Sequence, residues 1–381
     1  MGEAATSPSD RFALKLFREL ARGRESANVF CSPFSVMLCL MMLREGATGD
    51  TREAMTRVLE LAGEDLEPSQ RPLQVLNALQ RLKSALDASD PGLELAIANS
   101  LWCGDQLPIQ PAFLSEVRKN FAAEIFSVPL ADPRTVTRIN SWVAENTRGK
   151  IPRMLDALDA LSMLVAVNAI YFKGLWREPF EKRQTRPAPF HPAGKLAIQV
   201  PLMHQDDEYP YYEDPSFQAV RLPYSGGRVG MYVFLPAKNS SLPDFLQSAA
   251  PALWVRLLGS FRNTAGIVAL PRFKFEYQAR LESILVTLGM GVAFRPQTAR
   301  FDRIALPPPP FWLDGVIHRA VVEVNEEGTE AAAATASVLT LAAASLSPPP
   351  FQMIVDRPFF FAIRDDHSGT ILFMGAVNNP A

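Results

Sequence analysis

The most informative stretch of the sequence is residues 326–336, which read EEGTEAAAATA. Its four consecutive alanines favour a helix, because alanine loses no side-chain entropy there. Read as a strand, the stretch has one face formed by Thr329, Ala331, Ala333 and Thr335. That face carries no large or charged side chain, so the strand could enter an existing sheet without overpacking its core, which typically costs about 1–3 kcal/mol. Gly328 could act as the hinge.

Composition describes a globular protein with an extensive core. Of its 381 residues, 48% are hydrophobic and 20% charged, which leaves the domain count open. Thirty-eight basic and 40 acidic residues give a net charge of −2. No overall charge therefore favours nucleic acid or an anionic membrane as a partner.

The cysteines and the start of the chain give little further direction. Cys31, Cys39 and Cys103 show no metal-ligand spacing, and an odd count is not a disulfide framework. The start lacks a basic region followed by an apolar core, so no signal peptide is visible. We expect a cytoplasmic protein if the chain is complete as given, and a secreted one if a signal was removed. The apolar stretch 36–43 is too short to span a bilayer, which takes about 20 residues.

Polar residues interrupt otherwise apolar segments at several places. A short strand leads into a helix at residues 28–35, with Ser32 as the cap candidate. Capping does not account for Ser35, whose buried hydroxyl needs a partner. The strand 164–172 is apolar on both faces except for Asn168, as expected of a central strand. Trp176 alone reads as a core aromatic, and His318 alone as a structural histidine.

Hydrolase signatures are missing from the sequence. It contains no G-x-S-x-G elbow, and its four histidines lie in no H-E-x-x-H spacing. No glycine-rich loop that could hold a phosphate is present either. The sequence therefore favours a protein without catalytic residues of its own.

Taken in order, these segments resemble the serpins over essentially the whole chain. Residues 326–335 match the start of the serpin reactive-centre loop, where an acidic pair, a glycine and a threonine precede small residues. The resemblance implies an α+β fold with three β-sheets and about nine helices. It also implies one domain over residues 1–381, with an exposed reactive-centre loop at about 326–351.

The resemblance assigns three groups of residues that control entry of the loop into the sheet. The shutter, under the centre of the main sheet, comprises Ser32, Ser35, Asn168 and His318. The breach, where the loop first enters, contains Trp176 and Arg272, and Arg272 is expected to pair with Glu326. An exposed pair of this kind would contribute about 0–1 kcal/mol. The hinge comprises Glu326, Gly328, Thr329, Ala331, Ala333 and Thr335.

Two kinds of function follow from the resemblance. The first is a suicide-substrate inhibitor, in which a serine protease attacks the loop and the cut loop inserts before the acyl-enzyme is hydrolysed. This implies a covalent complex and a monomer, without cofactor, metal, nucleic acid or membrane. The second is a non-inhibitory chaperone or carrier. Residues 329–336 favour the inhibitor, because they depart nowhere from the inhibitory pattern, whereas non-inhibitory members commonly carry bulky, charged or proline residues in the hinge.

Family spacing from Gly328 places the reactive bond at Ala342–Ala343, which indicates an elastase-like target. The Leu341–Ala342 and Ala344–Ser345 bonds are alternatives. No arginine or lysine lies between Glu327 and Arg357, so a trypsin-like enzyme finds no cation for its pocket. Candidate residues for a chymotrypsin-like enzyme are Leu339, Leu341 and Leu346. A cysteine protease is a further alternative.

Overall fold

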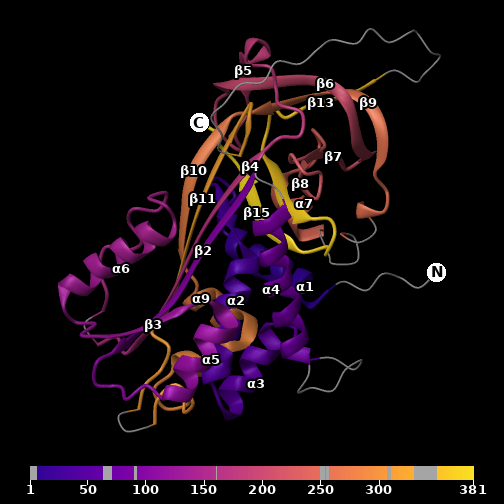
Figure 1. The fold of residues 1–381 in the computed structure, drawn as a ribbon. Coiled ribbons are helices and arrows are strands. Elements are labelled where there is room, and N and C mark those ends of the chain that lie inside the picture. The colour runs from indigo at the N-terminus through magenta and orange to yellow at the C-terminus, as the bar shows by residue number, and fades with distance from the viewer. Residues whose placement is uncertain are drawn as a thin grey trace.

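Two hydrogen-bonded sheets and the helices packed on them make up the described part of the chain (Figure 1). The computed structural model describes residues 7–62, 71–89, 92–159, 161–248, 254, 257–306, 310–329 and 350–381. The predicted hinge residues Ala331, Ala333 and Thr335 and the Ala342–Ala343 bond lie outside these ranges.

The six-stranded sheet has the strand order β10-β11-β12-β4-β2-β3. Its strands are β2 (Leu93–Gly104), β3 (Glu124–Val128), β4 (Leu164–Leu175), β10 (Phe273–Arg280), β11 (Gly315–Asn325) and β12 (Gly328–Thr329). Strands β4 and β11 pair directly and in parallel, from Gly315 with Val165 to Val321 with Tyr171. Beyond these pairs, β12 lies between the two strands and is antiparallel to both.

The other sheet is formed by nine strands. They are β1 (Val29–Cys31), β5 (Arg186–Phe190), β6 (Ile198–Asp214), β7 (Phe217–Pro223), β8 (Val229–Pro236), β9 (Arg262–Pro271), β13 (Phe351–Ile354), β14 (Phe359–Asp365) and β15 (Ile371–Val377). Because the long β6 pairs with β5, β9 and β7 in turn, the three expected sheets form two hydrogen-bonded networks in the described residues. The predicted α+β fold is confirmed.

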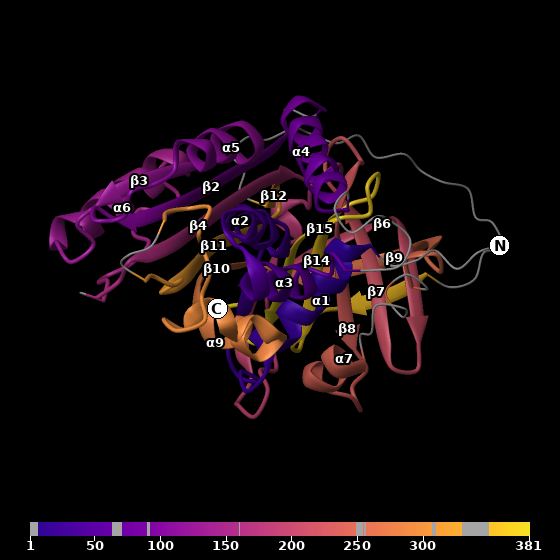
Figure 2. The same cartoon turned by 90° about the horizontal axis from the view of Figure 1, so that it is seen from below.

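Helices pack between the sheets and over their outer faces. They are α1 (Pro8–Ala21), α2 (Pro33–Gly46), α3 (Gly49–Val58), α4 (Arg71–Ser89), α5 (Pro111–Phe121), α6 (Pro133–Asn146), α7 (Leu242–Ser248) and α9 (Glu282–Leu285). A π-helical turn (Val286–Met290) follows α9, and 3-10 turns span Gly291–Phe294 and Lys182–Gln184. Figure 2 shows α2 between the two sheets. Ser32 caps it by accepting the Ser35 N–H at 3.1 Å. No helix in the described ranges is long and apolar enough to cross a membrane.

Strand β4 is covered on both faces, as its apolar sequence predicts. One face packs into the main core with α2, and the other contacts a second cluster that includes Ile139 and Val143 of α6. Every residue from 164 to 172 is buried. A new strand at the boundary between β4 and β11 would therefore lie between two packed layers.

Candidate functional site

Gly328 and Thr329, which follow β11 after a short turn, already form the strand β12 inside the six-stranded sheet. Gly328 lies opposite Asn325 and Leu175, and Thr329 opposite Val324 and Gly174. Thr329 is only 1% exposed. The start of the predicted hinge thus occupies a strand position between β11 and β4 in the uncut chain.

Position 328 requires glycine. Its φ is +151°, a conformation that L side chains rarely adopt. A Cβ atom there would lie 2.0 Å from the carbonyl oxygen of Gly174, and that oxygen belongs to backbone that cannot move aside. Any larger residue would push β12 out of the sheet.

Tyr224, which follows β7, holds Thr329 in this position. The two hydroxyl oxygens are 2.8 Å apart, and the tyrosine ring stacks on Trp176 with a centroid distance of 4.7 Å and an interplanar angle of 10°. Burial raises the pKa of Tyr224, so its hydroxyl stays protonated and can donate. A buried hydroxyl at Thr329 is satisfied here, whereas a longer side chain would collide with the ring.

Trp176 also fixes the turn between β11 and β12. Its indole Nε1–H donates to the carbonyl oxygen of Asn325 at 3.0 Å, and its backbone N–H donates to that of Glu327 at 2.9 Å. The breach residue is therefore a structural partner of the hinge as well as a core aromatic.

The Glu326 carboxylate is bound by Arg272 at the same end of the sheet. The Arg272 Nε atom lies 2.8 Å from both carboxylate oxygens, and the Thr185 hydroxyl donates to one of them. Glu326 is only 2% exposed whereas Arg272 is 43% exposed, so the pair is half-buried rather than the exposed surface pair considered above. Burial opposes ionisation of Glu326, but the hydrogen bonds from Arg272 and Thr185 outweigh it and hold its pKa below the usual range.

A second polar cluster lies at the middle of the boundary between β4 and β11. His318 and Asn168 are paired in register, and His318 Nδ1 is 2.5 Å from Asn168 Oδ1. Asn168 Nδ2 donates to the Ser35 hydroxyl at 2.6 Å. The Ser32 N–H donates to His318 Nε2 at 3.3 Å, and the Ser32 hydroxyl to Leu372 at 2.7 Å.

This cluster connects four elements through a single chain of hydrogen bonds. Because His318 Nε2 accepts from Ser32, the ring proton resides on Nδ1 and is donated to Asn168. The Ser35 hydroxyl, which the sequence left without a partner, is satisfied by Asn168. Separating β4 from β11 at this position would break the His318–Asn168 bond.

A comparison with known proteins identifies the family. The model of the Serpin family (serine protease inhibitor) matches residues 7–380. The chain belongs to the serpin family. An uncharacterised serpin-like protein of Thermococcus kodakarensis is 37% identical over 375 residues, covering 97% of this chain and 84% of that protein. The leukocyte elastase inhibitor of Bos taurus is 33% identical over 391 residues, covering 99% and 100%.

Solved structures agree with this assignment. The crystal structure of the thermophilic serpin tengpin in its native state superposes on this serpin with a TM-score of 0.89 at 26% identity. The match covers 100% of this chain and 95% of that one. The predicted serpin fold is thereby confirmed.

The structure of this serpin brings the predicted residues together in two clusters. Trp176, Arg272, Glu326, Gly328 and Thr329 meet at one end of the six-stranded sheet. The second cluster, at the middle of the sheet, contains Ser32, Ser35, Asn168 and His318.

Three participating residues were missed from the sequence. Asn99 lies opposite Asn168 in β2, and its Oδ1 accepts a hydrogen bond from Asn168 Nδ2 at 2.5 Å. Tyr224 and Thr185 contact Thr329 and Glu326. An asparagine inside an apolar strand is a signal for Asn99, as it was for Asn168. Nothing local marks Thr185.

The buried His318 makes the stability of this serpin depend on pH. Burial lowers the pKa of His318 to about 3, whereas an unfolded histidine titrates near 6.5. Between these values the unfolded chain binds one more proton than the native one. The free energy of unfolding should therefore fall by about 1.4 kcal/mol for each pH unit below about 6.5. Above about 6.5 this histidine contributes no slope.

Urea unfolding midpoints at pH 7, 6 and 5 would measure the effect. His318→Gln is the matched control, because glutamine can still donate to Asn168 but does not titrate. The wild-type midpoint should fall faster with acidification than that of the variant. Parallel curves for the two proteins would contradict the assignment to His318.

Replacing Glu326 by lysine should open the end of the sheet. The new cation would lie beside Arg272, so the variant loses this half-buried pair and gains a like-charge contact, which should cost more than the roughly 1 kcal/mol of an exposed pair. We expect oligomers to form on mild heating, as β12 leaves the sheet and the boundary becomes available to another copy. Size-exclusion chromatography after heating measures this.

Glu323→Lys provides the control for that variant. Glu323 lies on β11, three residues before Glu326, and pairs with Lys274 of β10 at 2.6 Å, but it is 27% exposed. It should stay monomeric under conditions that convert Glu326→Lys. Equal behaviour of the two variants, or a monomeric Glu326→Lys, would count against a role of Glu326 in closing the sheet.

Proposed function

We propose that this serpin inhibits a serine protease of elastase-like specificity as a suicide substrate. The observation that carries the proposal is β12, which places the start of the loop between β11 and β4. The rest of that boundary is closed by parallel pairing from 315 to 321 and by the His318–Asn168 hydrogen bond. Further entry requires these two strands to separate, without a change in the rest of the sheet.

The register of β12 tells where the following residues would lie. Thr329 is paired with Gly174 on β4 and with Val324 on β11. Thr335 comes six residues later, and because β12 is antiparallel to both strands, it would lie opposite the residues six positions earlier, Asn168 and His318. Its hydroxyl could accept from His318 Nδ1–H and donate to Asn168 Oδ1. The inserted strand would then replace the bond that its entry breaks.

Small side chains are needed along the same path. If the register continued on insertion, Ala331 would lie opposite Phe172 and Ala333 opposite Ile170, whose side chains belong to the main core. A large residue at either position would overpack that core. The small residues 331–335 thus suit a strand that enters late, after the core has formed.

The chemistry belongs to the protease. Its serine oxygen attacks the carbonyl carbon of Ala342, the Ala342–Ala343 amide bond breaks, and Ala343 leaves with a new amino group. Ala342 is left as an ester on the enzyme. Insertion of the cut strand then moves the tethered protease and distorts its active site before water hydrolyses the ester. The serpin supplies no catalytic residue, acts as a monomer and needs no cofactor, metal, nucleic acid or membrane.

The elastase-like target rests on the residues around the proposed bond and on a relative. Leu341, Ala342 and Ala343 are small or apolar, and 328–356 contains no lysine or arginine. The Bos taurus relative is named as a leukocyte elastase inhibitor. An enzyme with a small apolar primary pocket would accept Ala342, whereas a trypsin-like enzyme would find no cation.

A panel of proteases tests the target. Incubation with elastase-like, chymotrypsin-like and trypsin-like enzymes, followed by denaturing gels, should give a stable complex with the first. The mass of the released fragment should place its new N-terminus at Ala343. A complex only with the chymotrypsin-like enzyme would move the bond to a leucine, and one only with the trypsin-like enzyme would overturn the assignment. Cleavage without any complex would favour a non-inhibitory carrier or chaperone.

A further inference from the structure

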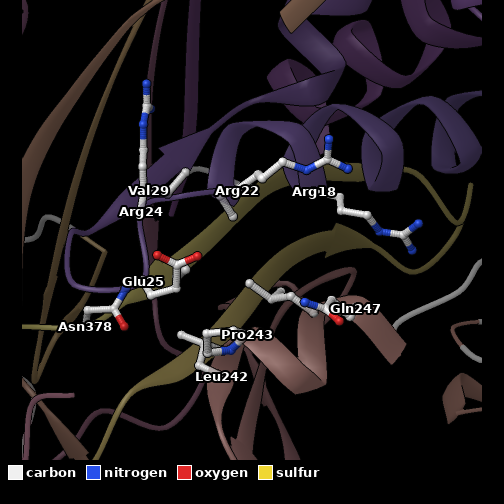
Figure 3. A pocket seen from close by; sticks show the side chains of 12 residues that line it. Arg18, Arg22, Arg24, Glu25, Val29, Leu242, Pro243, Gln247 and Asn378 are labelled. Carbon is white, nitrogen blue, oxygen red and sulfur yellow. The ribbon is translucent and has the colours of Figure 1, made fainter. Parts of the chain in front are cut away.

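A pocket lined by none of the hinge or shutter residues lies between α1, α7 and the end of β15 (Figure 3). It opens to solvent and encloses about 170 Å³, close to a cavity of about 150 Å³ that holds one benzene ring. Its apolar lining is formed by Ala21, Val29, Leu242, Pro243, Leu246 and Ala376. The volume and lining suit the body of one small aromatic molecule.

A buried acceptor at one end of the pocket has no partner. Asn378 is 4% exposed, and its Oδ1 atom makes no hydrogen bond within the described ranges. The amide is held in this orientation because Nδ2 donates to the carbonyl oxygen of Ala27 at 2.6 Å. A buried oxygen left in this state costs free energy that a donor would recover. This end of the pocket therefore favours a ligand with an N–H or O–H group.

Cationic and amide donors lie toward the other end. Figure 3 shows Glu25 beside Asn378, and Arg18 and Gln247 on the opposite side, with Arg22 next to Arg18. Arg22 contacts Glu19 at 2.8 Å and is 67% exposed. A guanidinium carries five N–H donors in a planar fork, so Arg22 can hold a second carboxylate as well.

We propose that this pocket binds a small aromatic acid with a hydrogen-bond donor on its ring. The donor would meet Asn378 Oδ1, the ring would lie on Leu242 and Leu246, and the carboxylate would reach Arg22. The site does not depend on the reactive-centre loop, so it would serve as a ligand site in addition to the proposed inhibition.

Three related probes separate the parts of this proposal. Indole-3-acetate carries the ring donor and the carboxylate, 1-naphthaleneacetate lacks the donor, and tryptamine lacks the carboxylate. In calorimetric titrations of the full chain we expect indole-3-acetate to bind most tightly. Loss of either group should weaken binding by about 5-fold or more, the size of one hydrogen bond or ion contact.

Variants place the binding in the pocket. Arg22→Gln should lower the affinity for indole-3-acetate by about 5-fold. Leu246→Trp should abolish binding, because the larger side chain would fill the pocket. Arg57→Gln is the matched control, because Arg57 also pairs with a glutamate of its own helix, Glu53, and is 64% exposed.

Three results would overturn the proposal. One is no saturable binding of indole-3-acetate to the wild type. The second is equal affinity for the three probes. The third is equal binding by Arg22→Gln and Arg57→Gln. Should Leu246→Trp fold poorly, the probe series and the arginine pair still decide.

Discussion

Cutting the loop between Leu339 and Ser345 is expected to raise the melting temperature of this serpin by on the order of 10–20 °C. The cut strand would continue from Thr329 along the register of β12 and pair with β4 and β11 on both sides. About ten newly paired residues at roughly 1 kcal/mol each give about 10 kcal/mol. For a chain of this length that corresponds to roughly 1–2 °C per kcal/mol.

Calorimetry before and after limited proteolysis measures this rise. Mass analysis of the fragments should confirm that the cut lies in the loop, and a gel that both fragments stay associated. An unchanged melting temperature after such a cut would mean that the strand does not insert, and the inhibitory account would fail.

If this serpin inhibits as proposed, Thr329→Arg is expected to turn it into a substrate. Thr329 is buried against Tyr224, and a buried unpaired charge costs several kcal/mol. Because position 329 is already buried in the uncut chain, the arginine would first expel β12 from the sheet, and insertion after cleavage would have to bury its charge. Insertion would then be slowed, while the protease could still hydrolyse the acyl-enzyme. Because each 1.4 kcal/mol is a factor of ten in rate, we expect at least about ten times more serpin to be cleaved for each complex formed.

Thr329→Ser is the matched variant, since serine keeps the hydroxyl that faces Tyr224. It should inhibit with nearly wild-type stoichiometry. Titration of a fixed amount of protease gives the stoichiometry of each protein directly. If Thr329→Arg forms the covalent complex as efficiently as the wild type, burial of position 329 is not part of the mechanism.

Much of this site could be predicted from local sequence patterns. Ser32 and Pro33 mark the start of α2. The strand around Asn168 could be predicted to be central, because a strand buried on both faces is apolar throughout and does not alternate between apolar and polar residues. A buried hydroxyl at Ser35 needs a hydrogen-bond partner, because leaving it unpaired costs free energy, and in the structure this partner is Asn168.

Contacts between distant segments could not be predicted in this way. Tyr224 lies 105 residues before Thr329, and Thr185 lies 141 residues before Glu326. Nor could helical propensity show that Gly328 and Thr329 already belong to the sheet, because that depends on Gly328 leaving room for the backbone carbonyl of Gly174. Burial of Glu326, and with it the strength of its pair, depended on the same packing.

Separation of β4 from β11 is the central claim, and a reversible crosslink tests it most directly. Ala169 and Arg319 are paired in register on these neighbouring parallel strands. Adjacent strands lie about 4.8 Å apart, which suits the Cα separation of a disulfide. The double variant Ala169→Cys/Arg319→Cys would hold the boundary closed when oxidised and release it when reduced. The two single variants control for loss of each side chain.

The decisive measurement is the yield of covalent complex with an elastase-like protease before and after reduction of that double variant. The account predicts that the oxidised protein is cleaved in its loop without forming a complex, and that reduction restores the complex to the level of the single variants. An oxidised protein that traps the protease as efficiently as the reduced one would contradict the account.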